Sequence, residues 1–354
     1  MAINPQVQAL FSVLGITTSP NQITGIDGNL LPEILNGTSG SDYMLGLGGI
    51  DTLNGGGGND YLEGGMGADV LVGGSAANTQ DTLGYATAGS AVNVTLVANG
   101  LAALVGGAAL GDVATGFENV VGSGFADTIT GDNLANVLAG LDGDDTLNGG
   151  GGDDTLIGGD GADRLNGGDG IDTVDYSGSI LNVDVDLYGS SGSEDAVGDI
   201  YQAVENAVGG SANDTLDGND DANRLDGGGG NDWLRGNEGN DILIGGLGSD
   251  MLTGGDGFRG SDSGGSDKFQ YRSLAEILSN DVIKAFFKDD FIDLSMADAD
   301  PNTAGRQPFH FGPGVGQIEY SSGLSPTIHV TGESGGINVM IRNTLGLEAY
   351  NFIF

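Results

Sequence analysis

Cysteine is absent from the 354-residue chain, and basic residues are scarce. Without cysteine the chain has neither a disulfide framework nor a thiol nucleophile. Ten Lys and Arg residues stand against 50 Asp and Glu residues, so the formal net charge at pH 7 is −40. This charge would repel the phosphates of nucleic acids, which excludes them as partners, and it keeps the chain expanded until cations neutralise it.

Signals for membrane insertion are also missing. The first basic residue is Arg164, so we expect no Sec-type signal peptide, which begins with a positively charged segment. The longest uncharged stretch lies between Asp81 and Asp112, but Asn93, Asn99 and several glycines interrupt it. A membrane-spanning helix needs about eighteen consecutive apolar residues, so we expect no span here.

Glycine, by contrast, accounts for 70 residues and is arranged in a nine-residue repeat. The clearest copies follow the pattern G-G-x-G-x-D-x-U-x, where U is a large apolar residue. They read GGGGNDYLE (55–63), GGMGADVLV (64–72), GGDGADRLN (158–166), GGDGIDTVD (167–175) and GGLGSDMLT (245–253). A repeat this short cannot bury a core alone, so its copies must stack into an all-β solenoid.

The U positions form a column of aliphatic residues and Met. Because strand residues alternate between two faces, this column is predicted to point inward while its neighbours face solvent. The residues before each strand supply a turn in which glycine tolerates positive φ. Two nonapeptides then make one coil, with a strand and a turn on each side. The predicted inward residues are Met44, Leu53, Leu62, Leu71, Ile129, Leu138, Leu147, Leu156, Leu165, Val174, Leu216, Leu225, Leu234, Leu243 and Leu252.

Repeats, spacers and ends divide the chain. Asn4 followed by Pro5 predicts the start of a short helix and Gly15 its end, and we expect this segment to cover the first coil. Seven of the ten basic residues lie at or after Arg259, which predicts a separate C-terminal module of strands that closes the solenoid. The predicted parts are an N-terminal cap (1–35), block 1 (36–74), spacer 1 (75–121), block 2 (122–175), spacer 2 (176–208), block 3 (209–269) and a C-terminal module (270–354).

The two spacers are copies of each other. Residues 111–140 align without gaps to residues 198–227, and DTLGY (81–85) matches DTVDY (172–176). Their alternating apolar residues predict strands. We therefore expect the spacers to continue the solenoid with wider coils.

Aspartates at the nine-residue spacing are candidate metal ligands. Each corner repeats one carboxylate and several glycine carbonyls, and such hard oxygen ligands suit Ca²⁺. A site needs two turns, with one Asp from each of two coils that are two repeats apart. Asn136 and Asn223 replace the carboxylate in two coils, so the sites that they share with Asp154 and Asp241 should be weaker. We predict about nine Ca²⁺ ions, held by Asp42, Asp51, Asp60, Asp69, Asp127, Asp145, Asp154, Asp163, Asp172, Asp214, Asp232, Asp241 and Asp250.

Catalytic motifs give weak signals. GESGG (332–336) matches the G-x-S-x-G pattern of serine nucleophiles, but a chain this rich in Gly and Ser is expected to match it by chance. His310 and His329 are the only histidines. The pattern H-E-x-x-H does not occur, which excludes a zincin site.

The nonapeptides resemble the RTX signature of hemolysin-type toxins, serralysin proteases, secreted lipases and alginate epimerases. The tail, with DDFIDLSMADADPNTAG (289–305) and GQIEY (316–320), is similar to the C-terminal domain of serralysins. The resemblance implies a parallel β-roll with Ca²⁺ between its turns, and export by a type I secretion transporter that reads an uncleaved C-terminal signal. The catalytic domains of those families are not expected in residues 1–35, and residues 351–354 lack the acidic residue that often occurs near a serralysin terminus.

Together these features predict a secreted, non-catalytic calcium-binding protein, extracellular or on the surface of a Gram-negative bacterium. Its role would be structural, in a surface layer or matrix, with self-assembly or cell-surface polysaccharide as partners. A calcium-dependent glycan-binding adhesin is an alternative, because Tyr43, Tyr61 and Trp233 follow repeat aspartates at positions predicted to face outward. A solenoid lyase or epimerase is another, but such sites need a cation near the substrate carboxylate, and the first 163 residues contain no basic residue.

Overall fold

The computed structural model divides the chain into two compact units. Unit 1 comprises residues 1–178 and 196–204, and unit 2 comprises residues 179–195 and 205–354. The structure describes residues 3–16, 20–24, 31–74, 79–97, 103–105, 109–189, 196–255, 265–272, 276, 281–286 and 290–293, and the backbone of strands at 310–311, 317–320, 327–330, 337–341 and 352–353.

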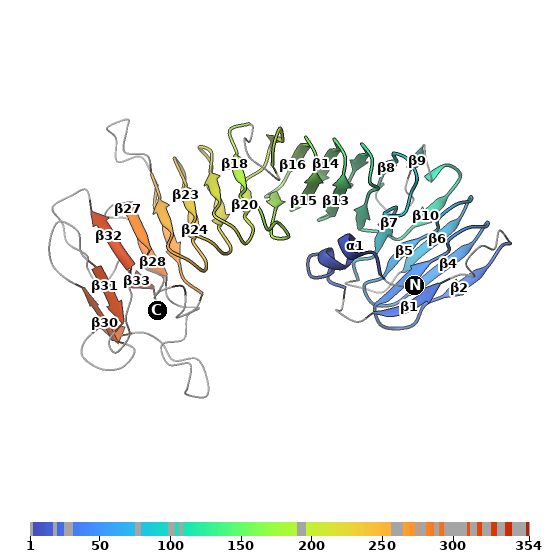
Figure 1. Ribbon diagram of the computed structural model, residues 1–354, viewed down its shortest axis with the longest axis horizontal. Coiled ribbons are helices and arrows are strands. Elements are labelled where there is room, and N and C mark those ends of the chain that lie inside the picture. The colour runs from blue at the N-terminus through green and yellow to red at the C-terminus, as the bar shows by residue number, and fades with distance from the viewer. Residues whose placement is uncertain are drawn as a thin grey trace. The chain divides into compact units, whose positions relative to one another are not determined.

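Unit 1 is a parallel β-solenoid with strands on two faces (Figure 1). Its first face contains, in spatial order, β1 (Asn21–Thr24), β3 (Asp42–Leu45), β5 (Tyr61–Glu63), β7 (Thr82–Gly84), β11 (Asn119–Val121), β13 (Val137–Asp142), β15 (Thr155–Asp160) and β17 (Thr173–Asp175). Its second face consists of two sheets. The first contains β2 (Ile34–Asn36), β4 (Thr52–Gly56), β6 (Val70–Gly74) and β10 (Val113–Thr115). The other contains β9 (Ala103–Val105), β8 (Asn93–Thr95), β12 (Thr128–Thr130), β14 (Thr146–Gly151), β16 (Arg164–Asp169) and β19 (Ile200–Gln202).

Unit 2 repeats this arrangement. Its first face contains β20 (Asn206–Val208), β22 (Arg224–Asp226), β24 (Ile242–Ile244), β26 (Lys268–Gln270), β28 (Phe291–Asp293) and β33 (Phe352–Ile353). Its second face contains β18 (Asp184–Asp186), β21 (Thr215–Asp217), β23 (Trp233–Arg235), β25 (Met251–Thr253), β27 (Val282–Phe286), β32 (Ile337–Ile341), β31 (Thr327–Val330), β30 (Gln317–Tyr320) and β29 (His310–Phe311). Strand β31 runs antiparallel to both of its neighbours. Strands of the C-terminal region thus extend both faces, as expected.

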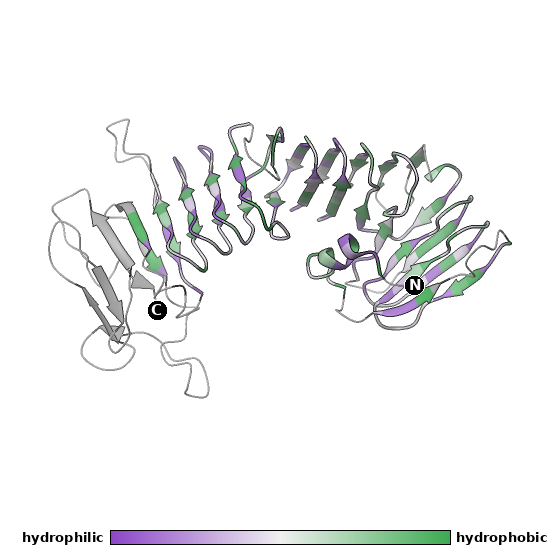
Figure 2. Cartoon of the chain, in the orientation of Figure 1, coloured by the Kyte–Doolittle hydropathy of each residue, from purple (hydrophilic) through white to green (hydrophobic). Residues whose placement is uncertain are grey.

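Inside the repeat blocks one coil is two nonapeptides long. Thr146 on β14 pairs with Arg164 on β16, and Val137 on β13 pairs with Thr155 on β15, so the register advances by 18 residues in both faces. Every predicted inward residue has at most 1% of its surface exposed. Hydrophobic and hydrophilic residues alternate along the strands (Figure 2), as the two-residue period of a β-strand requires.

Spacer 1 continues the solenoid as predicted. Its strands β7 and β11 lie next to each other in the first face. Between them the chain forms β8, which pairs with β12 of the following sheet, and then β10, which pairs with β6 of the preceding sheet. Spacer 2 has the same strand order, with β18 in unit 2 and β19 in unit 1.

The N-terminal helix α1 (Pro5–Leu10) begins as predicted, with the Asn4 side chain accepting the Gln6 N–H at 2.9 Å. Its position corrects our expectation of an end cap. Val7 and Phe11 lie against the outward side chains of the first face, in one buried cluster that comprises Val7, Phe11, Leu14, Ile16, Tyr43, Leu45, Tyr61, Val121, Val137, Ala139 and Leu141. The helix therefore braces block 1, spacer 1 and the start of block 2 from the side. No helix in the described part of the chain is long and apolar enough to cross a membrane.

Candidate metal centre

The repeat aspartates stack into ladders along the corners of the solenoid. In each predicted pair, one carboxylate oxygen (Oδ1) accepts the backbone N–H of the aspartate or asparagine 18 residues earlier. The donor–acceptor pairs are Asp42–Asp60, Asp51–Asp69, Asp127–Asp145, Asn136–Asp154, Asp145–Asp163, Asp154–Asp172, Asp214–Asp232, Asn223–Asp241 and Asp232–Asp250, at 2.7–2.9 Å. All the predicted site residues are therefore placed in pairs on neighbouring coils, and their role as calcium ligands stays a prediction.

The second oxygen of most ladder aspartates has no protein partner. Among the described residues, Oδ2 is buried without a hydrogen bond in Asp51, Asp60, Asp69, Asp145, Asp154, Asp163, Asp232, Asp241, Asp250 and Asp267. A buried, unsatisfied carboxylate oxygen is costly, because it has lost water and gained no donor. A native fold that repeats this feature at regular spacing indicates positions suited to bind a cation.

Glycine keeps the space beside these oxygens open. A Cβ added to Gly140 would meet Oδ2 of Asp145 and the carbonyl oxygen of Gly158 on the next coil at less than 3.0 Å, and Gly149 lies in the same way against Asp154. Each ladder position is thus a cradle of carboxylate and carbonyl oxygens, which is the ligand set that Ca²⁺ prefers. The described residues contain no cluster of three or more His, Cys, Asp and Glu side chains, because each site combines two carboxylates with backbone carbonyls.

Burial changes the acidity of the ladder carboxylates. It raises the pKa of Asp145, Asp154 and Asp163 to about 7 and that of Asp232 to about 8, with neighbouring carboxylates adding to the effect. The charged form is disfavoured because it has neither water nor a counter-charge. The ladder therefore needs either a proton or a cation.

The first aspartate of three ladder segments is satisfied differently. Oδ2 of Asp42 accepts the Thr38 N–H at 2.6 Å, and Oδ2 of Asp214 accepts the Gly210 N–H at 2.6 Å. Asp127 is held by the Ser123 N–H in the same way. These carboxylates are paired as predicted, but the protein itself occupies their second oxygen.

The two asparagines also replace a cation with protein groups. The Asn136 side-chain amide donates to the Glu118 carbonyl, and the Asn223 amide donates to the Glu205 carbonyl, both at 2.7 Å. An amide can donate as well as accept. The weaker calcium binding that we expect at these two positions stays a prediction.

Several ladder members were missed because they break the nine-residue spacing. The additional hydrogen-bonded steps are Asp60–Asp81, Asp69–Asp112, Asp163–Asp199, Asp241–Asp267, Asp250–Asp281 and Asp267–Asp290, at 2.8–3.1 Å. The sequence held a signal for some of them, since the alignment of residues 111–140 with 198–227 superposes Asp112 on Asp199.

Two of the three aromatic residues predicted to face solvent are buried. Tyr43 and Tyr61 are 1% and 0% exposed and stack with a centroid separation of 4.9 Å, with Phe11 packed against Tyr43. They do point out of the solenoid, but helix α1 covers them. Trp233 is 51% exposed, as predicted.

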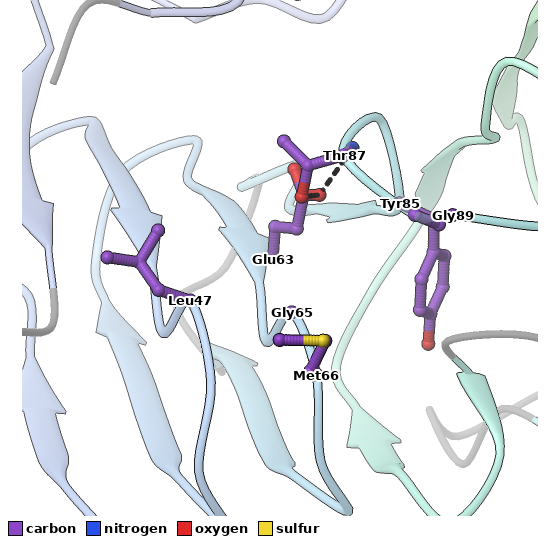
Figure 3. A pocket seen from close by; sticks show the side chains of 8 residues that line it. Leu47, Glu63, Gly65, Met66, Tyr85, Thr87 and Gly89 are labelled. Carbon is purple, nitrogen blue, oxygen red and sulfur yellow. Dashed lines mark hydrogen bonds between the residues drawn. The ribbon is translucent and has the colours of Figure 1, made fainter. Parts of the chain in front are cut away.

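A small pocket lies beside this buried cluster (Figure 3). Its lining includes Glu63, Met66, Tyr85 and Thr87, and its volume is about 210 Å³. The Glu63 carboxylate accepts the Thr87 N–H at 2.7 Å and the Tyr61 hydroxyl at 2.9 Å. Burial raises the pKa of Glu63. Because protein donors satisfy both oxygens of this acid, the pocket is better explained by structural packing than by catalysis.

A parallel solenoid with buried aspartate ladders defines the class of calcium-binding β-roll proteins. The family model of the RTX calcium-binding nonapeptide repeat matches residues 36–71, 45–79, 139–174, 204–234 and 226–258, so the chain contains RTX calcium-binding nonapeptide repeats. The matched residues include parts of all three repeat blocks and leave residues 122–138 of block 2 unmatched.

Other comparisons add little. No curated protein matches the chain in sequence. Among solved structures it is similar to the extracellular lipase LipA from Serratia marcescens, with 15% identity and a TM-score of 0.28. The alignment covers 67% of this chain and 39% of the lipase chain, so this chain spans well under half of that enzyme.

Proposed function

We propose that this protein is secreted unfolded, folds on binding Ca²⁺ outside the cell, and serves a structural role in a surface layer or matrix without catalysing a reaction. The observation that carries the proposal is the repeated pair of ladder carboxylates whose second oxygens lack a protein donor. Such a ladder is incomplete as a folded structure until cations enter it.

The free energy available from calcium is large enough to control folding. At a calcium concentration about ten times the dissociation constant, linkage supplies about 1.4 kcal/mol per site, or about 13 kcal/mol for about nine sites. Typical domains are stable by about 5–15 kcal/mol. Low cytosolic calcium would therefore leave the chain unfolded and exportable, and extracellular calcium would fold it.

Export is the part of the proposal that rests on the sequence. RTX repeats are typical of type I secretion substrates, and the tail resembles the C-terminal domain of serralysins. We assign the uncleaved secretion signal to the C-terminal module (270–354), with a type I transporter as its partner. Segment 289–305, which carries most of this resemblance, lies largely outside the described residues.

A non-catalytic role is supported by the environment of the cationic side chains. Arg272 contacts Asp226 at 2.7 Å, Arg235 forms an ion pair with Asp217, and Lys268 lies 3.8 Å from Asp293. In an enzyme acting on uronate polymers, a cation would have to face the substrate carboxylate. These cations face carboxylates of the protein instead.

One sheet of unit 1 supports self-assembly. Ile34, Thr52, Val70 and Val113 are in register on β2, β4, β6 and β10, and Ile34, Val70 and Val113 are 73%, 40% and 45% exposed. None of the outward positions of these four strands is ionisable. In a chain with net charge −40, copies repel each other wherever charged surfaces meet. We assign this uncharged face to contact with a second copy.

Size-exclusion chromatography with light scattering tests both parts of the proposal. In EDTA we expect an expanded monomer, and in about 5 mM calcium, above the affinity range of extracellular modules, a folded chain that forms ordered assemblies. Val70→Asp should prevent assembly but not folding, whereas Thr146→Asp, an exposed position of another sheet, should leave assembly intact. A chain of unchanged size in both conditions would contradict calcium-driven folding, and a folded monomer at all concentrations would contradict the structural role.

Glycan binding is a second candidate, favoured by Trp233. Its side chain is 51% exposed, and Thr215 and Met251 flank it in register on β21 and β25. An exposed indole ring beside polar groups suits stacking against a sugar. Calcium-dependent binding to a glycan array that Trp233→Ala abolishes and Met251→Ala preserves would favour this function over the structural one.

A further inference from the structure

In three coils of the solenoid, the glycine that keeps the cradle open is replaced by a larger residue. On the first face, the residue four positions after each ladder residue is the glycine that opens the cradle, as in Gly64, Gly140, Gly158 and Gly245. In three coils this position holds a tyrosine instead, within DTLGY (81–85), DTVDY (172–176) and DKFQY (267–271).

Strand register confirms that these tyrosines stand in the place of glycine. Leu62 on β5 pairs with Leu83 on β7, so Gly64 is in register with Tyr85. Leu156 on β15 pairs with Val174 on β17, so Gly158 is in register with Tyr176. Since a single methyl group would already fill the cradle at a glycine position, a tyrosine at this position must occupy the space itself.

The first two tyrosines reach the carboxylate that ends a ladder. Tyr85 and Tyr176 are 2% and 6% exposed. The Tyr85 hydroxyl donates to Oδ2 of Asp112 at 3.2 Å, and the Tyr176 hydroxyl donates to Oδ2 of Asp199. Oδ2 is the atom that has no protein donor in the interior ladder positions.

Asp112 and Asp199 also have matching surroundings, and neither is followed by another ladder residue. They precede β10 and β19, which are the last strands of their sheets. The N–H of Asp112 donates to the Ala109 carbonyl, and that of Asp199 to the Ala196 carbonyl, whereas interior aspartates donate to the carboxylate of the next coil. The two ladders that end at Asp112 and Asp199 thus each end in a local turn and a tyrosine.

The third copy stands at the corresponding position of its ladder, but its hydroxyl forms no hydrogen bond with a described residue. Tyr271 is 1% exposed, and Leu243 on β24 pairs with Phe269 on β26, so Gly245 is in register with Tyr271. Val282 pairs with Asn338 on the following strand, which places Ile337 in register with Asp281. The third ladder therefore has no carboxylate beyond Asp281.

We infer that Tyr85, Tyr176 and Tyr271 are terminators of the calcium ladders: each fills the cradle with its ring and, at Asp112 and Asp199, supplies a hydroxyl proton where interior positions need a cation. Asp112 and Asp199 then bind no calcium, although they continue the hydrogen-bonded ladder. The inference deepens the proposed function and rests on calcium binding by the interior sites. The terminators would also divide the calcium sites of the second face into groups, because among the described residues no hydrogen-bonded ladder step crosses Asp112 or Asp199.

The number of calcium ions bound per chain, measured by flow dialysis, tests the inference. Asp199→Asn should leave this number unchanged, while Asp163→Asn, one coil earlier in the same ladder, should lower it by at least one. Tyr176→Gly removes the donor and restores the glycine that opens the cradle in the interior coils, so it should add one ion. If Tyr176→Gly does not fold, the two Asp→Asn variants still decide.

The outcomes distinguish a failure of the proposed function from a failure of the terminator inference. A wild-type chain that binds no calcium would refute the proposed function itself. A wild-type chain that binds calcium, but loses as many ions with Asp199→Asn as with Asp163→Asn, would refute the terminators alone. An unchanged number of ions in a folded Tyr176→Gly variant would refute them as well.

Discussion

The repeat blocks and the spacers carry the same aspartate ladders but neutralise them in different ways. In block 2 the second oxygens of Asp145, Asp154 and Asp163 have no protein donor. In the spacers a tyrosine hydroxyl serves Asp112 and Asp199. Whether a buried carboxylate needs an ion thus depends on one residue across the core, which is a glycine in the blocks and a tyrosine in the spacers. Folding of the blocks should consequently depend on calcium far more than packing at the spacers does.

Removing calcium should have the largest effect. With EDTA in excess the chain loses about 1.4 kcal/mol of stabilisation for each site that had been at ten times its dissociation constant, and about nine such losses exceed the stability of many domains. We expect loss of the β-sheet circular dichroism signal and of amide protection in the blocks. Retention of both in EDTA would show that the ladders are stable without ions.

Acid should partly replace calcium. Burial raises the pKa of Asp145, Asp163 and Asp232 from an ordinary value of 3.8 to about 7 or about 8, so the folded state binds protons more tightly than the unfolded state. Without calcium, the stability from these protons is fully present below about pH 4 and is lost as the pH rises through about 7 to 8. In EDTA the chain should therefore show a stronger β-sheet circular dichroism signal at about pH 5 than at about pH 8. An equally weak signal at both pH values would contradict the desolvated ladder.

With calcium bound the pH dependence should reverse, because protons and Ca²⁺ compete for the same oxygens. Calcium affinity should fall as the pH decreases below about 7. Titrations with calcium at several pH values provide the measurement. They also separate the ladder sites from carboxylates on the surface, whose affinity for calcium should respond to pH only near their ordinary pKa.

Packing of helix α1 and Phe11 against the first face should stabilise unit 1 without affecting ion binding. Phe11 is 3% exposed and packs on Tyr43, so Phe11→Ala should cost about 3–5 kcal/mol and lower the unfolding temperature of calcium-loaded protein. Gln8→Ala, at an exposed position of the same helix, should cost little. The number of bound calcium ions should stay the same in both variants, and a reduced number in the folded Phe11→Ala variant would show that the helix also shapes the ladder.

The sequence predicted the parts of the fold that follow a strict period. A nine-residue interval places Leu147 and Leu165 in the core and Asp145 opposite Asp163, because identical coils leave no freedom in the register. Coil length, the inward column and every predicted aspartate pair followed from that period.

The remaining features depend on contacts that no local pattern encodes. Asp81 and Asp199 belong to the ladders, but the chain reaches them after 21 and 36 residues instead of 18. Tyr61 has the sequence position of a solvent-facing residue and is buried because Phe11, 50 residues earlier in the numbering, packs in the cluster above it. Variable loops and distant covering segments therefore set the limit of sequence-based prediction here.

A single interior carboxylate should have the smallest effect. Asp163 takes part in the pair above it and in the step below it, so Asp163→Ala should remove at least one calcium ion and about 1.4 kcal/mol or more of calcium-dependent stability. Asp160 lies in the same nonapeptide and is exposed, so Asp160→Ala removes the same charge without touching the ladder. Calorimetric calcium titrations of the two variants compare a site ligand with general electrostatics. If both variants lost calcium equally, the protein would be binding calcium as a diffuse counter-ion to its net charge, and the distinction between blocks and spacers would disappear.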